Sequence, residues 1–233
     1  MDPTTNQLLH RHNAPENSNH PTTDSVRAFA EDAANGIWVG TDAGLYYFDA
    51  DTKQFTHYQH NPKDPASLSG NRILSLLVDR QGNLWVGLEE GGLNRLQSGA
   101  DHFELIHADK SAPTSLAGRR ITSLLQTHDN NIWVSTYDAG IFRIAHDSDS
   151  LAHISTELEH LKHLNNIRIS AMIQIAEDEL WVGTIKDGIS IIDPATATIR
   201  LNIRHDPVIP GSLSFDRIGA FWRDRAGLLW IST

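Results

Sequence analysis

A short apolar pattern built around tryptophan recurs along the chain at a nearly constant interval. Its five copies centre on Trp38, Trp85, Trp133, Trp181 and Trp230, which lie 47, 48, 48 and 49 residues apart. A period of roughly 40 to 50 residues is typical of repeated all-β units. Such a unit cannot bury its apolar faces alone, so it has to pack against its neighbours. The repeat therefore constrains the fold strongly, although a fold does not by itself define a function.

Each repeat predicts four short strands separated by turns. An apolar strand begins 12 residues before each tryptophan, and a turn containing Gly, Asn or Asp follows it in most copies. The tryptophan lies on the second strand, and a glycine-containing turn leads to the third and fourth strands. The predicted fold class is all-β, a β-propeller with blades of four antiparallel strands. Four complete repeats with partial repeats at both ends predict an open arc or an incompletely closed ring.

The repeats predict one propeller domain that is a fragment of a larger propeller. Residues 8–13 resemble residues 55–61, which predicts the last strand of a preceding blade over residues 8–12. Leucines at three-residue spacing in residues 157–166 predict a short helical turn. The expected segments are the end of a preceding blade and a linker (1–25), blade 1 (26–71), blade 2 (72–119), blade 3 (120–166), blade 4 (167–216) and the first half of blade 5 (217–233).

Composition excludes several classes of function. The chain has 233 residues and no cysteine, so disulfides, thiolate metal sites and cysteine nucleophiles are excluded. Its formal net charge of −10 argues against a nucleic-acid partner, which would require clustered Lys and Arg. No apolar run approaches the roughly 20 residues of a membrane-spanning helix. Residues 1–7 contain neither the basic nor the apolar region of a signal peptide.

Four sequence features together resemble the two-component regulator propeller repeat. They are the pattern Asn-Leu-Trp-Val-Gly, the turn and strand Gly91–Leu96, the linker from His60 to Leu68, and the strand and turn from Asn71 to Gly82. Residues 55–96 carry the fullest copy, and the resemblance extends from about residue 7 to residue 233. Ser135 replaces the usual glycine in the third copy, and the third linker also departs from the pattern.

This resemblance implies a sensor region of a bacterial hybrid histidine kinase or GGDEF diguanylate cyclase. In such receptors the propellers are periplasmic, and a membrane helix and a cytoplasmic output domain follow them. We therefore expect a small-molecule ligand, such as a carbohydrate-derived one, and self-association through the parent receptor. The membrane and the signalling enzyme would be reached only through parts outside this chain. No cofactor is expected.

Four arginines define the candidate ligand site. Each lies one residue before a first strand, where Ser25 stands in the first repeat. The first strand of a propeller blade is innermost, so these side chains would surround one mouth of the central channel. Guanidinium groups in such a cluster suit a carboxylate, sulfate or phosphate. The alternative is that each arginine pairs with a carboxylate or carbonyl of a neighbouring blade. The four are Arg72, Arg120, Arg168 and Arg217.

The remaining conspicuous residues have structural explanations. The five tryptophans are expected to pack between blades, because a position repeated in every blade serves the blade geometry. Asp32, Asp79 and Asp224 suit Asx turns, and the spacing around Asp79 departs from a sialidase Asp box. The thirteen histidines include the close pairs His57/His60 and His160/His163, but no convergent metal site is predicted.

Three functions compete on this reading. The first is a non-catalytic ligand-sensing module, and the second is a protein–protein interaction or dimerisation scaffold without its own small ligand. The third is a propeller lyase or hydrolase, which would require an asymmetric cluster of acid, base or metal ligands. No nucleophile elbow, Walker loop or dinucleotide fingerprint is present. We therefore expect no catalytic residues.

Overall fold

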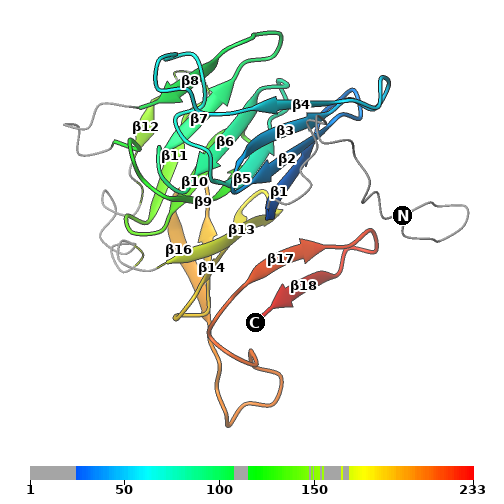
Figure 1. Cartoon of the computed structure of the whole chain (residues 1–233). Coiled ribbons are helices and arrows are strands. Elements are labelled where there is room, and N and C mark those ends of the chain that lie inside the picture. Colours follow the sequence, from blue (N-terminus) through cyan, green and yellow to red (C-terminus); the bar gives the residue numbers. More distant parts are fainter. Residues whose placement is uncertain are drawn as a thin grey trace, which may run out of the picture.

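The computed structural model describes residues 25–107, 115–146, 148, 150–152, 154, 164 and 168–233. Within these ranges the chain forms four four-stranded antiparallel sheets followed by a two-stranded sheet (Figure 1). The predicted all-β class and the four-stranded antiparallel blades are therefore confirmed. The strand of residues 8–12 lies outside the described residues, as does nearly all of the 157–166 turn. Across the described ranges, no helix is both long enough and apolar enough to cross a membrane.

The strands follow one another in chain order within every sheet. The first sheet consists of β1 (Val26–Glu31), β2 (Ile37–Thr41), β3 (Gly44–Phe48) and β4 (Phe55–Tyr58). The second consists of β5 (Ile73–Val78), β6 (Leu84–Leu88), β7 (Leu93–Leu96) and β8 (Phe103–Ile106). The third consists of β9 (Ile121–Gln126), β10 (Ile132–Thr136), β11 (Ile141–Ile144) and β12 (Leu151–Ala152). The fourth consists of β13 (Ile169–Ala176), β14 (Glu179–Thr184), β15 (Ile189–Asp193) and β16 (Thr198–Ile203). The last consists of β17 (Ala220–Arg223) and β18 (Leu229–Ser232).

The first strands of consecutive sheets lie against one another. Strand β1 contacts β5, β5 contacts β9, β9 contacts β13, and β13 contacts β17. In Figure 1 the sheets accordingly follow one another in an arc, from blue β1–β4 to the red β17–β18 hairpin. The first strand of every sheet therefore lies on the inner side of the arc. Each of the four candidate arginines comes directly before the leading apolar residue of such a strand, so these arginines also lie on the inner side.

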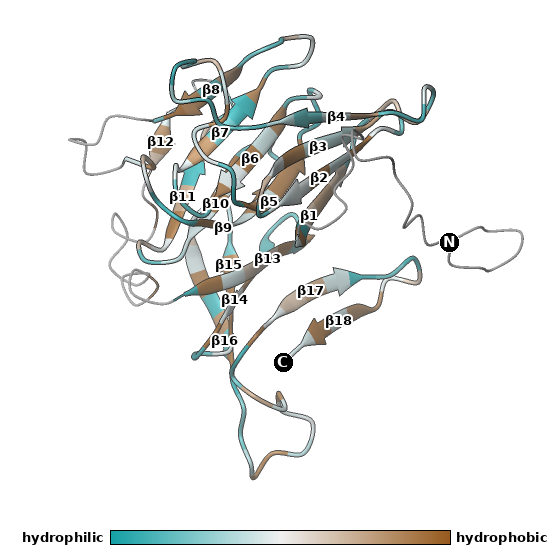
Figure 2. Ribbon diagram, viewed as in Figure 1, coloured by the Kyte–Doolittle hydropathy of each residue, from teal (hydrophilic) through white to brown (hydrophobic). Residues whose placement is uncertain are grey.

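The apolar core lies between neighbouring sheets. One cluster joins Trp38 and Leu45 of the first sheet to Ile73 and Val86 of the second. Equivalent clusters join the second sheet to the third and the third to the fourth. Figure 2 shows apolar residues concentrated on the strands and polar residues on most of the turns. Each sheet is thus stabilised mainly by burial against the next, as expected for a repeat architecture.

A glycine follows three of the four Trp-Val pairs and makes this close approach possible. A Cβ added at Gly40 would lie 2.5 Å from Cγ2 of Ile73 in the next sheet. The corresponding distance is 2.7 Å from Gly87 to Ile121, and 2.6 Å from Gly183 to Ile218. In each case the first apolar residue of one sheet occupies the space that a side chain on the preceding sheet would need.

Ser135 takes the place of this glycine in the third sheet and is fully buried. Its hydroxyl lies 2.9 Å from Oγ1 of Thr122 and can also donate to the carbonyl of Ser123 at 3.4 Å. The departure from glycine is therefore accommodated by hydrogen bonds to the first strand of the same sheet. A buried hydroxyl without such partners would be destabilising.

The Ser-Leu linkers are built into the core. Leu68 and Leu116 are 1% and 0% exposed. The Ser67 hydroxyl accepts from the N–H of Asn61 and donates to its carbonyl, which closes the loop before the second sheet. Ser212 makes the same two bonds with Asp206 before the last sheet. His60 Nδ1 also lies against the carbonyl of Leu68. The linker thus sets the spacing between consecutive sheets.

A double-mutant cycle tests the packing of Ile73 on Gly40. We expect Gly40→Ala to lower the free energy of unfolding by about 1–3 kcal/mol, because the new methyl group overpacks the contact. Ile73→Ala alone should cost about 2–5 kcal/mol through the cavity it leaves. In the double variant the alanine methyl has room, so the combined loss should be smaller than the sum of the two. Urea denaturation measures all four species, and strict additivity would contradict the assigned contact.

Candidate functional site

The inner mouth of the arc carries a row of arginines and carboxylates. Arg72, Arg120, Arg168 and Arg217 each precede the first apolar residue of a first strand. A second recurring position lies four residues after the tryptophan in the first four repeats. Its occupants, in chain order, are Asp42, Glu89, Tyr137 and Ile185. The backbone N–H at this second position bonds to the carbonyl of the arginine of the same sheet for Glu89, Tyr137 and Ile185, at 2.9, 3.0 and 3.1 Å. The repeat therefore holds the two positions side by side in three consecutive sheets.

Two of the arginines are joined by one carboxylate. Glu89 forms ion pairs with both Arg72 of its own sheet and Arg120 of the next. The Glu89 side chain is only 11% exposed, whereas those of Arg72 and Arg120 are 51% and 38% exposed. A mostly buried carboxylate thus anchors two half-exposed guanidinium groups across the boundary between the second and third sheets.

The row continues into the first sheet. Asp42 accepts two hydrogen bonds from Arg27, at 2.7 and 3.0 Å, and its Oδ1 lies 3.5 Å from Nε of Arg72. The hydrogen bond from Arg27 is the main cause that lowers the pKa of Asp42 below its usual value. Arg27 stands two residues after Ser25, so it approaches Asp42 from β1 itself. The alternative to a ligand site is that each arginine pairs with a carboxylate or carbonyl of a neighbouring blade. Arg72 and Arg120 do so, with Asp42 and Glu89 respectively.

Tyr137 replaces the carboxylate in the third sheet. The guanidinium carbon of Arg120 lies 4.6 Å from the centre of its ring, and that of Arg168 lies 3.9 Å from it. Both distances suit cation–π attraction. An open hollow of about 620 Å³ adjoins this part of the mouth, lined by Glu89, Ser115, Ala117, Gly118, Arg119, Arg120, Tyr137 and Asp138.

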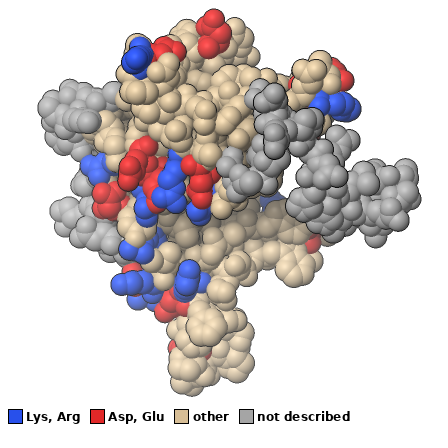
Figure 3. Space-filling view, viewed as in Figure 1, with Lys and Arg blue, Asp and Glu red and all other residues tan. Residues whose placement is uncertain are grey.

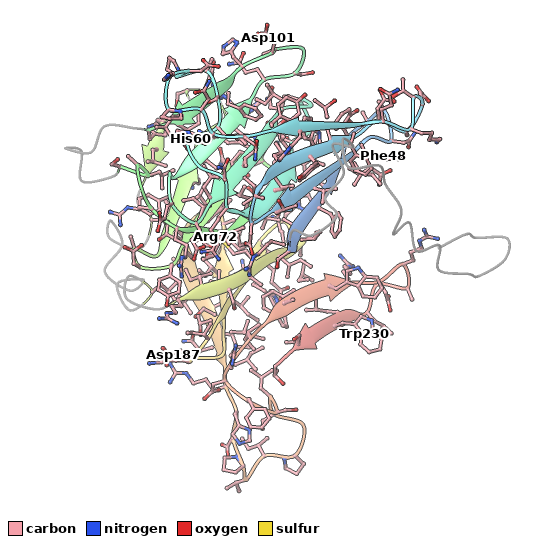
Figure 4. All side chains as sticks on the ribbon, in the orientation of Figure 1. Phe48, His60, Arg72, Asp101, Asp187 and Trp230 are labelled. Carbon is pink, nitrogen blue, oxygen red and sulfur yellow. The ribbon has the colours of Figure 1, made fainter. Side chains whose placement is uncertain are left out.

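Arg217 lies at the last boundary and is exposed. The row of charges runs across the middle of the face shown in Figure 3, where Figure 4 labels Arg72. The structure therefore places the four predicted arginines at equivalent positions along one mouth. It gives them different partners, which the arginine spacing alone did not indicate.

The five tryptophans differ in burial. Trp38, Trp85 and Trp133 are 8%, 3% and 0% exposed, and Trp181 is half-buried. The expectation of burial between blades is wrong for Trp230, which is 57% exposed. Its sheet has two described strands, and no described sheet packs on its outer side. The repeated tryptophan is buried only where a following sheet covers it.

An aspartate at the end of the first strand anchors both the turn and the indole. Oδ1 of Asp79 accepts from the N–H groups of Gln81 and Asn83, and Oδ2 accepts from Nε1 of Trp85 at 2.7 Å. Asp224 repeats this arrangement with Trp230 at 3.0 Å, a hydrogen bond that is the main cause lowering the pKa of Asp224. The Asx turns predicted at these aspartates are present, whereas their bonds to tryptophan were not predicted. The six-residue Asp-to-Trp spacing is shared by Asp32, Asp79 and Asp224 and is the one sequence signal for these bonds. Spacing alone is not sufficient, because Oδ2 of Asp32 accepts from the Tyr47 hydroxyl at 2.8 Å.

The third sheet lacks this anchor because Thr127 stands in place of the aspartate. Trp133 is fully buried, and within the described residues its Nε1 has no hydrogen-bond partner. The Thr127 hydroxyl instead donates to Asp129. A buried indole N–H without an acceptor is destabilising, so this turn is a weak point of the third sheet.

Grafting the turn of the second sheet onto the third tests this assignment. Thr127→Asp combined with Asp129→Gln should raise the free energy of unfolding by about 1 kcal/mol, because it supplies the missing acceptor to Trp133. Asp79→Ala should lower it by about 1–3 kcal/mol, since it orphans the Trp85 indole and two turn amides. Thermal unfolding measures both variants. Loss of stability in the grafted variant would contradict the proposed role of the aspartate.

Charge removal at Glu89 tests the shared ion pair. Glu89→Gln should lower the free energy of unfolding by about 1–2 kcal/mol, because two guanidinium groups lose their common partner, although both are half-exposed to solvent. Glu90→Gln, which makes the same charge change at the exposed neighbouring residue, is the matched control and should leave stability within about 0.5 kcal/mol. Urea denaturation at low salt compares them, and equal effects would refute the shared pairing.

The histidine pairs singled out in the sequence do not converge on a metal site within the part of the chain that the structure describes. Within the described ranges, no group of three or more His, Asp or Glu side chains is arranged to hold a metal ion. His57 and His60 contact backbone carbonyls of Ala43 and Leu68, each on a separate turn. His160 and His163 lie outside the described residues.

Comparisons with known proteins agree with the repeat and the fold. The family model described as "Two component regulator propeller" matches residues 67–90 and 115–138. No curated protein matches the chain significantly in sequence. The two matched segments contain Arg72, Glu89 and Arg120, so they include the ion-paired part of the mouth.

Similar solved structures include the extracellular domains of two B. thetaiotaomicron proteins, BT4673 and BT3049, each of which is described as a hybrid two component system. BT4673 is 22% identical, with a TM-score of 0.74 over 94% of this chain and 27% of its own. BT3049 is 21% identical, with a TM-score of 0.72 over 88% of this chain and 27% of its own. A streptogramin B lyase is 14% identical, with a TM-score of 0.60 over 91% of this chain and 63% of its own. These likenesses show the fold, and this chain spans about a quarter of the length of the two extracellular domains.

Proposed function

We propose that this chain, which carries two component regulator propeller repeats, is a non-catalytic ligand-sensing part of a bacterial signal-transduction receptor. The observation that carries this proposal is the match of two consecutive repeats to that family model. Propeller neighbours among the extracellular domains of hybrid two component systems support it. Under this proposal the segment is periplasmic, and it biases a kinase or diguanylate cyclase located in other parts of the receptor.

The inner mouth is the proposed sensing surface. Its arginines come from successive sheets, so a ligand that bridges them contacts more than one blade at once. Such a ligand favours the arrangement of blades that aligns its partners, and the free energy it contributes is limited to its differential affinity for that arrangement. Because neighbouring sheets share apolar cores, a small shift between two of them would be passed along the arc.

Deletion of this segment from the full-length receptor tests the sensing role. An in-frame deletion of residues 26–233 should abolish the stimulus-dependent change of a transcriptional reporter, while an immunoblot confirms that the receptor is still made. Charge reversal at Glu89 (Glu89→Lys) should weaken the response at unchanged receptor level, whereas Glu90→Lys should not. A normal stimulus response in the deletion variant would overturn the proposal.

A second candidate is a protein-interaction scaffold without its own small ligand. It is favoured by large apolar side chains exposed on the two end sheets, with Phe29 66% exposed on β1 and Trp222 62% exposed on β17. Such faces are suited to covering by another protein surface. Light scattering of the receptor's extracytoplasmic region over a wide concentration range distinguishes the two, because a concentration-independent monomer that still responds to ligand contradicts the scaffold.

A further inference from the structure

The residue four positions after the tryptophan recurs at the inner mouth in the first four sheets, and its side chain differs from sheet to sheet. At each boundary two arginines flank one recurring residue of the earlier sheet. Glu89 lies between Arg72 and Arg120 as a shared carboxylate. Asp42 lies between Arg27 and Arg72 in the same role. At these first two boundaries the protein therefore supplies its own anion to each pair of guanidinium groups.

The internal anion is lost at the third boundary. Tyr137 stands where Glu89 stands one sheet earlier, and both Arg120 and Arg168 lie over its ring. The aromatic face compensates part of the positive charge without forming an ion pair. Arg120 keeps Glu89 as its ionic partner, whereas among the described residues Arg168 has no carboxylate within 4.0 Å.

The fourth boundary has neither a carboxylate nor an aromatic ring at this position. Ile185 occupies it, and its N–H bonds to the carbonyl of Arg168 at 3.1 Å, as Glu89 bonds to Arg72 at 2.9 Å. Arg217 follows on the other side. Two backbone bonds that flank these residues, from Ile218 to Thr184 at 2.8 Å and from Gly188 to Asp216 at 2.9 Å, fix the last first strand against the Ile185 turn. The repeat thus places the backbones of Arg168 and Arg217 on either side of Ile185, in the register that Arg72 and Arg120 have around Glu89.

The charges around this boundary are mainly positive. Lys186 is exposed next to Ile185, and Arg204 lies 3.4 Å from Asp187. The carboxylate of Asp216, beside Arg217, accepts from the N–H of His205 at 2.6 Å. In the portion that the structure describes, Arg217 has no carboxylate within the 4.0 Å of an ion pair. Figure 4 labels Asp187 on the fourth blade, away from the mixed cluster around Arg72.

We propose that the boundary between the fourth and fifth sheets binds the oxyanion group of a small ligand between Arg168 and Arg217. The bound group takes the place that the Glu89 carboxylate fills between Arg72 and Arg120. A carboxylate is the first choice, because the internal anions at the other boundaries are carboxylates, and a sulfate offers the same acceptor chemistry. This inference rests on the proposed sensing function and names the chemical class of its ligand.

Filling the position with an internal anion provides the sharpest test. Ile185→Glu recreates the side chain of the second sheet, and the new carboxylate should pair with both arginines and exclude the ligand. Ile185→Gln is the matched control, because a glutamine side chain has nearly the same shape as glutamate but carries no charge. Isothermal titration calorimetry of the 233-residue chain at low salt would use D-glucuronate, D-glucose 6-sulfate and uncharged D-glucose as probes.

The expected result is that the wild-type chain binds at least one charged probe and does not bind D-glucose. Ile185→Glu should weaken that binding by about tenfold or more, and Ile185→Gln should change it less than about threefold. Arg168→Gln and Arg217→Gln should each weaken it about tenfold. Arg200→Gln, which removes an arginine of the outermost strand β16 that pairs with Asp178 and Asp193, should leave it unchanged. Preference for the glucuronate or the sulfate ester identifies the anionic group.

Two results would overturn the inference. One is the absence of binding by either charged probe to the wild-type chain, and the other is unchanged binding in Ile185→Glu. A reporter assay in the full-length receptor separates this outcome from failure of the sensing function. A receptor that carries Ile185→Glu and still responds to its natural stimulus keeps the sensing role but refutes this site. A receptor that binds the anion at this boundary but never changes its output refutes the sensing role and keeps the site.

Discussion

The whole structure depends on one recurring contact, in which the first apolar residue of a sheet packs onto a glycine of the preceding sheet at three of the four boundaries. Ile73 on Gly40, Ile121 on Gly87 and Ile218 on Gly183 repeat it along the arc. Because the contact leaves no space for a side chain, it fixes both the distance and the register between sheets. The buried tryptophans and linker leucines then complete the apolar clusters on either side of it. No single sheet could bury this surface alone.

The same fixed register brings the arginines and their neighbouring side chains together at the inner mouth. Once the sheets are spaced by their cores, the arginine before each first strand must lie beside the residue four positions after each tryptophan. That second residue changes from Asp42 and Glu89 to Tyr137 and then to Ile185. The backbone arrangement is thus constant, whereas the side chain at this position changes from a paired carboxylate to an aromatic ring in a cation–π contact and then to an apolar residue. These variable residues are better candidates for a functional role than the repeated ones, because the repeated residues are needed for packing.

The repeat also tolerates substitutions when a local hydrogen bond compensates for them. Ser135 replaces a packing glycine, and its hydroxyl bonds to Thr122 and Ser123. Thr127 replaces the anchoring aspartate without such compensation, and the buried indole of Trp133 lacks an acceptor among the described residues. The third sheet therefore carries both departures. The end sheets differ for another reason, since Phe29 and Trp230 remain exposed where no described sheet covers them.

Reading the sequence alone was enough to predict the fold class, the four strands of each complete repeat and the position of the arginines. These features follow from local periodicity and from turn residues, which depend on neighbours along the chain. It could not determine the partners of those arginines, because Glu89 of the second sheet meets Arg120 only after the third sheet has packed against it. Nor could it show that Trp230 is exposed while Trp133 is buried, since the two lie in the same pattern and differ only in what covers them. These contacts arise only when the sheets pack, because burial and ion pairing depend on which sheet comes next in space.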